Sequence, residues 1–325
     1  MPVYMPSASD VHVNKMLTEV LVGYENLEYI ADQIFPVVTV SKQTDIIPEV
    51  EQSAFFRNQG DIPLGEADIP AAIGYSVDTS STYRCNKHAL RHFISDDRRA
   101  NEDAPFDSDR DATFLVTNAL SLQRERAWVS DFWKTSVWTT DKVGGTDFDK
   151  FSDYGSSEPV EVMREYKRTI RRMIGRNPNT LVLGDLTRDV LIDHPDVLER
   201  IKYTERGIAT TDLLAALFDM DRVLVGESIY TADAEGTAEA SVSYTASWDD
   251  DALMLYAPSR PSIFTPSAGY TFVWNTGMGN GIQYMRKYRD DVRGGDWVEV
   301  RSYYDQKSIV ENAGLFLSDC VDAVA

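Results

Sequence analysis

The sequence has few of the residues that build disulfides and metal sites. Its 325 residues include two cysteines, Cys85 and Cys320, and four histidines. Two isolated cysteines form neither a disulfide framework nor a zinc-binding spacing, so we expect reduced thiols, as in a cytosolic protein. The chain has no apolar run of about 18 residues, the length that crosses a bilayer. Its first ten residues contain neither the basic nor the apolar region of a signal peptide.

Basic residues are also scarce relative to acidic ones. The 32 Lys and Arg residues stand against 52 Asp and Glu residues, which gives a formal net charge of -20. This balance argues against a protein whose main task is to bind nucleic-acid phosphates. Copies of such a chain repel one another unless their charges are arranged to match. The content of 43% hydrophobic residues argues against a disordered chain, and the length allows a large core.

The longest periodic segment runs from Asp107 to about Trp138 and predicts one long amphipathic helix. Asp107, Ser108 and Asp109 are candidates for the N-cap, and no glycine or proline follows until Gly144. A helix of roughly 28 residues would be about 40 Å long. Its apolar spacing departs from a strict heptad, which favours a helix lying along a sheet. The expected apolar stripe consists of Leu115, Ala119, Leu122, Val129, Trp133 and Val137.

Residues 1–44 predict an N-terminal arm. A helical pattern covers about 11–31, and an extended, β-branched segment follows at 34–40. Pro36 cannot donate a ladder hydrogen bond, so this segment is expected at the edge of a sheet. The apolar pattern begins by Val11, so we also expect no cleaved helical leader or fused scaffold domain ahead of the arm.

Residues 45–81 predict an extended loop. Prolines and glycines recur through it without a long periodic segment, which is uncommon inside a compact domain. It is too apolar for a solvated linker, so we expect a two-stranded excursion, with β-like pieces at 55–57 and 73–77, that packs on a neighbouring copy of the chain. The side chains expected at this contact are Phe55, Phe56, Ile62, Leu64, Ile69 and Tyr75.

Residues 82–150 and 291–325 are expected to form a peripheral unit around the long helix. The segment 81–100 predicts a strand followed by a short turn or helix. The alternating pattern of the C-terminal segment predicts antiparallel strands that pair with that strand beside the helix.

Residues 151–290 predict a small α/β unit. A helix begins at Pro159 and ends at Gly175. Two buried strands, 180–184 and 222–226, are linked by helices and are expected to be neighbours in one sheet. Two more strands are expected at 251–257 and 269–274, and 228–248 is expected to be a surface hairpin inserted into this unit.

Three patterns that could carry chemistry each have a structural explanation. The segment 277–281 is rich in glycine but lacks the GxGxxG spacing and the following helix of a dinucleotide site, so it predicts a turn. His88 and His92 could share one helix face, but no third ligand accompanies them. The acidic runs 107–111 and 249–251 lack the shaped glycine-containing loop of a calcium site. We therefore expect no catalytic residue, no cofactor and no metal ion.

One basic cluster lies in the helix that follows Pro159. It contains Lys167, Arg168, Arg171, Arg172 and Arg176. It predicts either a solvated, salt-bridged helix face or a contact with an acidic surface of the next copy. Direct genome binding is the weakest of the three explanations, because the chain as a whole is so acidic.

The order of these elements, together with the phrases NTLVLGDLTRDVLIDHPDVLERIKYT and GDWVEVRSYYDQKSIVENAGLFLSDCV, resembles the major capsid proteins of tailed phages. The resemblance extends from about Val11 onward. It implies an α+β fold of the Hong Kong 97 type, with an N-terminal arm and an extended β-hairpin loop. It also implies a peripheral domain built on a long spine helix, and an α/β axial domain that meets its copies at the centre of a capsomer.

The resemblance also implies partners and a location. We expect hexamers and pentamers of an icosahedral shell that encloses double-stranded DNA without sequence-specific contact, in a virion assembled in the host cytoplasm. The implied partners are a separate scaffolding protein, a portal protein and, as an optional component, a decoration protein. The resemblance implies no association with a membrane. Some relatives join subunits through an isopeptide bond from a loop lysine, but this sequence has no lysine between Gln43 and Asn86.

Two rival interpretations remain. The first is an encapsulin-like compartment shell of the same fold. The second is an α/β enzyme that uses the unit 151–290, with a site at the carboxyl ends of its strands. Only Thr180, Asp185 and Glu227 could contribute to such a site, and they match no known constellation.

Overall fold

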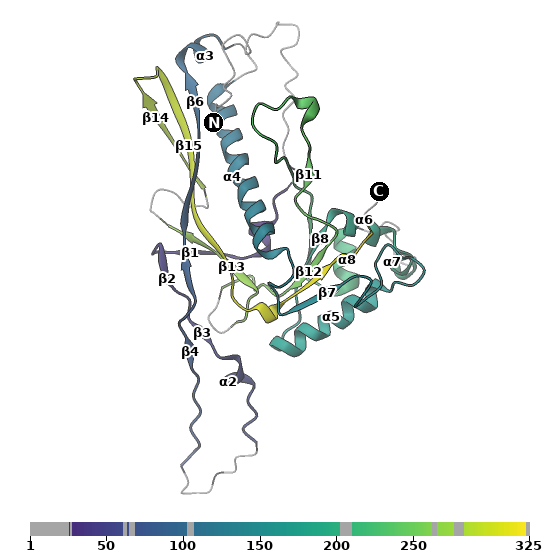
Figure 1. Ribbon diagram of the computed structural model, residues 1–325. Coiled ribbons are helices and arrows are strands. Elements are labelled where there is room, and N and C mark those ends of the chain that lie inside the picture. The colour runs from purple at the N-terminus through teal and green to yellow at the C-terminus, as the bar shows by residue number, and fades with distance from the viewer. Residues whose placement is uncertain are drawn as a thin grey trace.

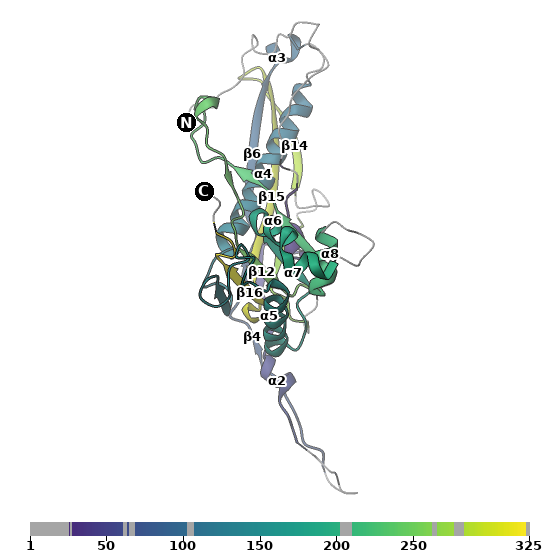
Figure 2. The same cartoon turned by 90° about the vertical axis from the view of Figure 1, so that its right-hand side faces the viewer.

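The computed structural model is an α+β molecule with two sheets, a long helix and a projecting loop (Figure 1). It describes residues 26, 28–60, 64, 69–102, 107–201, 210–261, 265–275 and 283–322. Most of the predicted helical arm, Ile62 and the glycine-rich segment 277–281 lie outside the described residues. Turned by 90°, the molecule is narrow, and the loop continues its long axis (Figure 2).

The first sheet is built around one long strand. On one side β15 pairs with β6. On the other side its first part pairs with β14 and its last part pairs with β13, and all three pairings are antiparallel. The edge strand β1 joins β13 in parallel, directly after Pro36, as the sequence predicted. The bounds are β1 Val37–Val40, β6 Asn86–Ser95, β13 Gly269–Trp274, β14 Gln283–Asp290 and β15 Gly295–Ser308.

The predicted long helix is α4, Ser108–Phe132, and it lies along one face of this sheet (Figure 1). The Asp107 side chain caps it by accepting hydrogen bonds from the backbone N–H groups of Asp109 and Arg110. The predicted extension to Trp138 is wrong. After Phe132 the chain turns, because the Trp138 indole donates to the Phe132 carbonyl oxygen and ends the helical ladder.

The predicted apolar stripe of α4 is also partly wrong. Leu115 is 56% exposed, whereas Val116 and Leu120 pack on Val300 of β15. The sequence pattern misled because the buried face includes two charged residues, Arg124 and Glu125. The full set of buried α4 residues is Ser108, Ala112, Val116, Leu120, Arg124, Glu125, Trp128 and Phe132.

The second sheet carries helices and forms the other half of the core. Its order is β7-β16-β12-β8-β9, with parallel pairs at both ends and antiparallel pairs in the middle. The strands are β7 Thr140–Val143, β8 Thr180–Gly184, β9 Arg222–Gly226, β12 Ala252–Leu255 and β16 Gly314–Ser318. The helices around it are α5 Pro159–Ile174, α6 Asp185–Asp193, α7 Pro195–Ile201 and α8 Thr211–Phe218 (Figure 1).

The chain crosses between the two sheets more often than the predicted units imply. Strands β13 and β14 belong to the first sheet, although the unit 151–290 included both. Strands β7 and β16 belong to the second sheet, although they were expected in the peripheral unit. Strand β16 has four buried residues and is completed by apolar neighbours on β12, which explains its place.

The loop and the inserted segment are both hairpins. Strands β2 Thr44–Ile46 and β5 Thr82–Arg84 pair at the base of the loop, and β3 Glu49–Val50 and β4 Val77–Asp78 pair further along it. The predicted β-like piece at 55–57 is wrong, because the helix α2, Gln52–Phe56, covers it. In the inserted segment, β10 Ile229–Tyr230 pairs with β11 Thr245–Ala246.

A buried carboxylate joins three distant parts of the chain. Glu125 of α4 accepts hydrogen bonds from the backbone N–H groups of Ile30 (3.2 Å) and Ala31 (2.8 Å), and from the Trp248 indole (3.0 Å). Ala31 begins the short helix α1, Ala31–Ile34. Burial raises the pKa of Glu125, although the three donors oppose that shift.

Replacing Glu125 by alanine should destabilise the chain. Glu125→Ala leaves three buried donors without an acceptor, and each unsatisfied donor costs about 1–3 kcal/mol. Removing a buried charge offsets part of this, so we expect a loss of about 3 kcal/mol in the free energy of unfolding, measured by urea titration of unassembled protein. The control is Glu165→Ala on the exposed face of α5. Equal stability of the two variants would contradict the structural role of Glu125.

Candidate assembly surfaces

The extended loop exposes most of its apolar side chains. Ile69 is 92% exposed, and the other described side chains of the predicted contact set, Phe55, Phe56, Leu64 and Tyr75, are also exposed. Ile62 lies outside the described residues. Exposed apolar side chains gathered on one projecting segment are typical of a site that a partner covers.

The base of the loop is anchored on its own chain, which the sequence did not predict. The Phe56 ring lies against Gly175, where an added Cβ would come within 2.7 Å of Cζ. The side-chain amide of Gln52 donates to the Met173 carbonyl oxygen at the end of α5. Gly175 also has φ +70°, a backbone conformation that favours glycine, and an added Cβ would displace the Phe56 ring. The loop is therefore held at α2, and its free part begins beyond Phe56.

An apolar pocket lies next to this anchor. It has a volume of about 740 Å³ and lies between the loop base, the end of α5 and β13. Val38, Ile47, Phe55, Tyr270 and Phe272 are among its lining residues.

The predicted basic cluster lies on α5 and faces solvent. Arg168, Arg171 and Arg172 are exposed and make no ion pair among the described residues. Lys167 instead pairs with Asp219, which follows α8. The three arginines lie on one helix, α5, and Arg171 and Arg172 belong to its last turn, the end on which the loop base is anchored.

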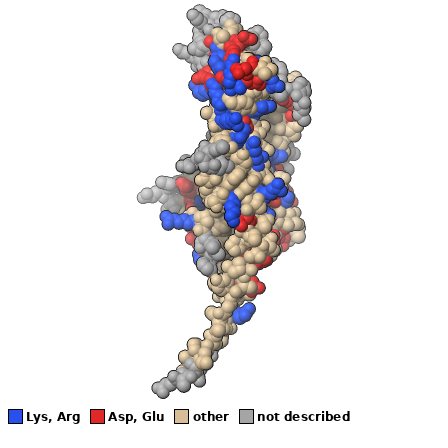
Figure 3. Space-filling model, turned by 90° about the vertical axis from the view of Figure 1, so that its left-hand side faces the viewer, with Lys and Arg blue, Asp and Glu red and all other residues tan. Residues whose placement is uncertain are grey.

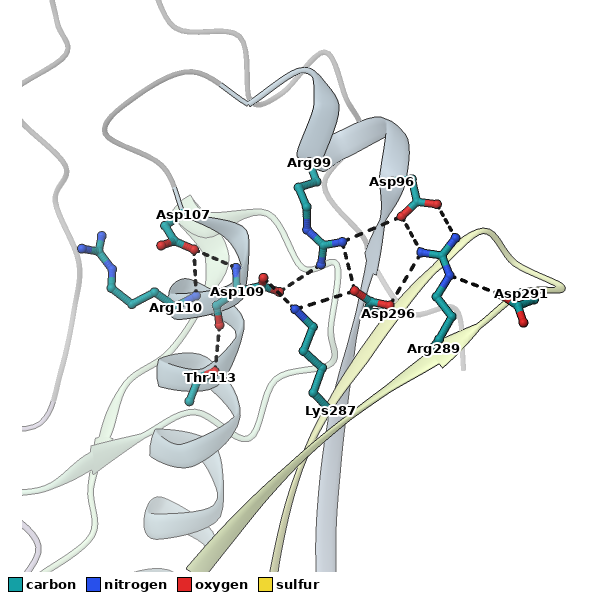
Figure 4. Close-up of polar contacts among 10 residues, drawn as sticks. All are labelled: Asp96, Arg99, Asp107, Asp109, Arg110, Thr113, Lys287, Arg289, Asp291 and Asp296. Atoms are coloured by element: carbon teal, nitrogen blue, oxygen red, sulfur yellow. Dashed lines mark hydrogen bonds and ion pairs between the residues drawn. The ribbon is translucent and has the colours of Figure 1, made fainter.

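The far end of the first sheet is closed by an ion-pair network that the sequence did not reveal. Arg99 contacts Asp109 and Asp296, both at 3.0 Å, and Lys287 contacts the same two carboxylates (Figure 4). Arg289 contacts Asp96 at 2.6 Å. The network links the short helix α3, Asp96–Ala100, to the start of α4 and to β14 and β15.

These contacts act on the carboxylates as expected. The Arg289 hydrogen bonds lower the pKa of Asp96. Burial acts to raise the pKa of Asp109, but Lys287 and Arg99 outweigh it and lower the value. The groups are partly exposed, so each pair is worth little alone, and the network mainly fixes geometry. Its charges are matched within the chain.

A buried serine and histidine resemble part of a hydrolytic centre, but the hydrogen bond between them runs in the wrong direction. The Ser157 hydroxyl donates to the Asp153 carbonyl oxygen, so it accepts from Nε2–H of His194 at 2.8 Å. The backbone N–H of Asp196 donates to Nδ1, which leaves the proton on Nε2. A nucleophilic serine needs the opposite arrangement, in which the imidazole accepts its proton. Burial also lowers the pKa of His194, although Asp196 opposes this shift.

The other candidate metal ligands, which are His88, His92 and the acidic runs, are not brought together among the described residues. His88 and His92 lie on strand β6 rather than on a helix, and His88 stacks on Tyr304. Among the described residues, no group of three or more His, Cys, Asp or Glu side chains could hold a metal ion. The described part of the chain also contains no helix with the length and apolar character to cross a bilayer.

Both cysteines are buried and are not joined to each other. Burial raises the pKa of Cys85 to about 11 and also raises that of Cys320. Neither thiol is therefore activated as a nucleophile near neutral pH.

The chain is 31% identical to the major capsid protein of Burkholderia phage BcepMu over 269 residues, which cover 80% of this chain and 82% of the relative. This chain belongs to the family of phage major capsid proteins. The major capsid protein of Pseudomonas phage JBD67 is 24% identical over 319 residues, 96% of this chain and 98% of that one. No protein-family model matches the chain.

Solved structures share the capsid fold. A phage-related protein from Bordetella bronchiseptica RB50 superposes with a TM-score of 0.66 at 22% identity, over 93% of this chain and 95% of that one. The capsid of cyanophage P-SCSP1u gives a TM-score of 0.60 at 12% identity, over 97% and 98% of the two chains. The identification as a tailed-phage major capsid protein of the Hong Kong 97 type is thus confirmed.

Asp251 gives this capsid protein a testable pH dependence. Burial raises the pKa of Asp251 to about 7, and the neighbouring Asp250 and Asp249 add to the shift. The folded state therefore binds a proton that the unfolded state releases near pH 4. The free energy of unfolding should fall as pH rises from about 4 to 7 and stay low above that range.

Asp251→Asn removes this penalty and keeps the acceptor for the Asp319 backbone N–H. At pH 8 we expect the variant to be more stable than the wild type by about 1–3 kcal/mol, and at pH 4 the difference should vanish. Urea unfolding of unassembled protein at both pH values measures this. Asp249→Asn, at an exposed neighbour, is the control. A gain at pH 8 no larger than that of the control would refute the assignment.

Proposed function

We propose that this major capsid protein assembles into hexamers and pentamers that close an icosahedral shell around double-stranded DNA. The observation that carries the proposal is the extended loop, whose apolar side chains are exposed in the isolated chain. Burying apolar surface stabilises association by about 25 cal/mol per Å². A neighbouring copy supplies that burial, and a closed shell gives every loop a neighbour.

The arginines on α5 form a second contact in this proposal. Arg168, Arg171 and Arg172 have no carboxylate partner in the described chain, and other parts of each copy are strongly acidic. An acidic surface of the next copy would pair with them, which orders the copies more than it adds affinity.

The shell needs other components in this account. A separate scaffolding protein sets its curvature, a portal protein occupies one vertex, and a decoration protein is a further possible partner. DNA is held without sequence-specific contact, and assembly takes place in the host cytoplasm. The major capsid relatives support the virion as the setting.

We infer that the protein is not an enzyme. The residues of the rival α/β enzyme site are each engaged elsewhere. Thr180 is buried and accepts a hydrogen bond from Arg222, the Asp185 carboxylate accepts from the Leu186 backbone N–H, and Glu227 pairs with Arg188. In the Ser157–His194 pair the imidazole donates the hydrogen bond, so it does not accept the serine proton as nucleophilic attack requires.

An encapsulin-like shell is the second candidate. The SrpI encapsulin of Synechococcus elongatus PCC 7942 superposes with a TM-score of 0.52 at 11% identity, over 96% of this chain and 95% of that one. That likeness supports the fold alone, whereas the sequence relatives are phage capsid proteins. A neighbouring gene for a cargo enzyme in place of a portal protein would favour the encapsulin.

Shortening the loop should abolish assembly and leave the fold intact. The deletion of residues 60–70 removes the end of the loop and leaves the anchored α2 and the ladder of β3 and β4 in place. We expect wild-type thermal unfolding of the monomer and no closed particles by negative-stain electron microscopy. Wild-type particles from this deletion would contradict the proposal.

The shell should be held without covalent cross-links. The loop has no lysine between Gln43 and Asn86, and the arginines within that range stay protonated near neutral pH, so an isopeptide bond from the loop has no amine nucleophile. Boiling mature particles in detergent should release monomers of about 36.6 kDa. A ladder of larger bands that survives boiling and reductant would refute this, whereas a ladder removed by reductant would implicate the cysteines.

A further inference from the structure

A polar pocket lies between α5 and the end of α8, and we call it the α5–α8 pocket. The two helices contact each other in the fold (Figure 2). The pocket has a volume of about 360 Å³, near the lower end of the range for small-ligand sites. One side of α5 borders it, because the α5 residues that line it recur every three or four positions. The charged and amide side chains that line it are Arg164, Lys167, Arg168, Arg171, Asn177 and Asp219.

Lys167 is already engaged within the chain. It donates to the backbone carbonyl oxygens of Phe218 and Asp219 at the end of α8, and it pairs with the Asp219 carboxylate. These contacts satisfy carbonyl groups that the end of a helix otherwise leaves open. The Lys167 hydrogen bond also lowers the pKa of Asp219, so both partners stay charged and the pair is neutral overall. Asp219 is the one carboxylate among the described lining residues, so none is left to balance the arginines.

The three arginines of the pocket have no partner of their own. Arg164, Arg168 and Arg171 make no hydrogen bond and no ion pair within the described residues. Glu161 and Glu165 lie on the same helix, but they do not line the pocket and pair with none of the arginines. The pocket therefore holds three uncompensated positive charges on a chain whose net charge is -20. Such a local reversal of charge attracts an anion to this position.

The spacing of the arginines fits a ligand that carries phosphate groups. Arg164 and Arg168 are four residues apart, so their Cβ atoms are about 5–6 Å apart on one helix face. Arg171 extends the row to about 10 Å along the helix axis. A guanidinium presents a planar fork of N–H donors that pairs with two oxygens of one phosphate. One phosphate can therefore bridge two neighbouring arginines, and a diphosphate can reach all three, with the Asn177 amide as a further donor.

A small anion explains the pocket better than a long polyanion does. DNA also carries phosphates, but a duplex on α5 would lie against the acidic remainder of the chain, which repels it. A small anion contacts only the pocket. Figure 3 shows another gathering of lysine and arginine, along the face of the first sheet turned away from α4. Those side chains spread over a sheet surface, whereas the arginines of α5 border a pocket of molecular size.

We propose that the α5–α8 pocket binds a small phosphate-bearing anion of the size of a diphosphate. Arg164 and Arg168 bind one phosphate and Arg171 binds the other. Lys167 offsets the charge of Asp219, which would otherwise repel the ligand. The site belongs to the single chain and goes beyond the proposed assembly. Because Arg168 and Arg171 pair with carboxylates of a neighbouring copy in that assembly, a bound anion would compete with this contact.

Isothermal titration calorimetry of the unassembled full chain with pyrophosphate tests the site. We expect the wild type to bind at a single site per chain. In Arg164→Gln/Arg168→Gln the affinity should fall by at least about tenfold, because the charge-assisted hydrogen bonds of two guanidinium groups are lost. Arg110→Gln/Arg260→Gln removes the same charge at two exposed positions outside the pocket and should bind as the wild type does. Thermal unfolding of each variant verifies that it is folded.

A variant that fills the pocket separates a defined site from diffuse attraction. Asn177→Trp places a large ring among the lining residues without changing the charge, so it should weaken pyrophosphate binding as the loss of the arginines does. Binding that survives Asn177→Trp, or that falls equally in the Arg110 and Arg260 control, would show attraction to surface charge alone and overturn the proposal. The proposal also fails if the wild type binds no pyrophosphate, or binds only a short DNA duplex. Because the titration needs no shell, each of these results would leave the proposed assembly standing.

Discussion

The placement of the long helix against the start of α1 and the second sheet depends on one buried carboxylate. Glu125 lies on the long helix, binds the start of α1 and accepts from the Trp248 indole, which comes just before β12 of the second sheet. Around it pack the rings of Phe35, Trp128, Phe132, Trp133 and Trp248, with neighbouring ring centres about 5 Å apart. A buried charge with three donors tolerates little rearrangement. It therefore fixes the first sheet and the helix α4 against the second sheet.

This junction was hidden from sequence reasoning, and the reason is physical. Glu125 falls among Gln123, Arg124 and Arg126, a polar stretch that the periodicity assigns to solvent. Only partners about 95 and 123 residues away make it a core residue. The same long-range pairing explains why β7 and β16 could not be assigned to the second sheet from local pattern. Strands β8 and β9 were found because each is apolar, short and flanked by helices, and the loop was found because prolines and glycines exclude other structures.

Positive and negative charges are concentrated in different parts of the chain. The tip network balances its charges inside one copy, so the tip keeps its shape without a partner. On the face of the first sheet turned away from α4, Lys87, Arg91 and Arg286 make no ion pair within the described chain. The loop has an excess of carboxylates. Sequence reasoning found the arginines of α5 because they cluster in one helix. It missed the three cations of the first sheet, because Lys87, Arg91 and Arg286 come together only when β6 and β14 pair with β15.

In the proposed assembly, a neighbouring copy covers the extended loop of each copy within a closed shell. A cryo-electron microscopy map of particles assembled from the full chain tests this claim most directly. We expect hexamers and pentamers in which density for 45–81 crosses to the neighbouring copy and is buried against it. Closed particles in which the loop lies along its own subunit would contradict the account.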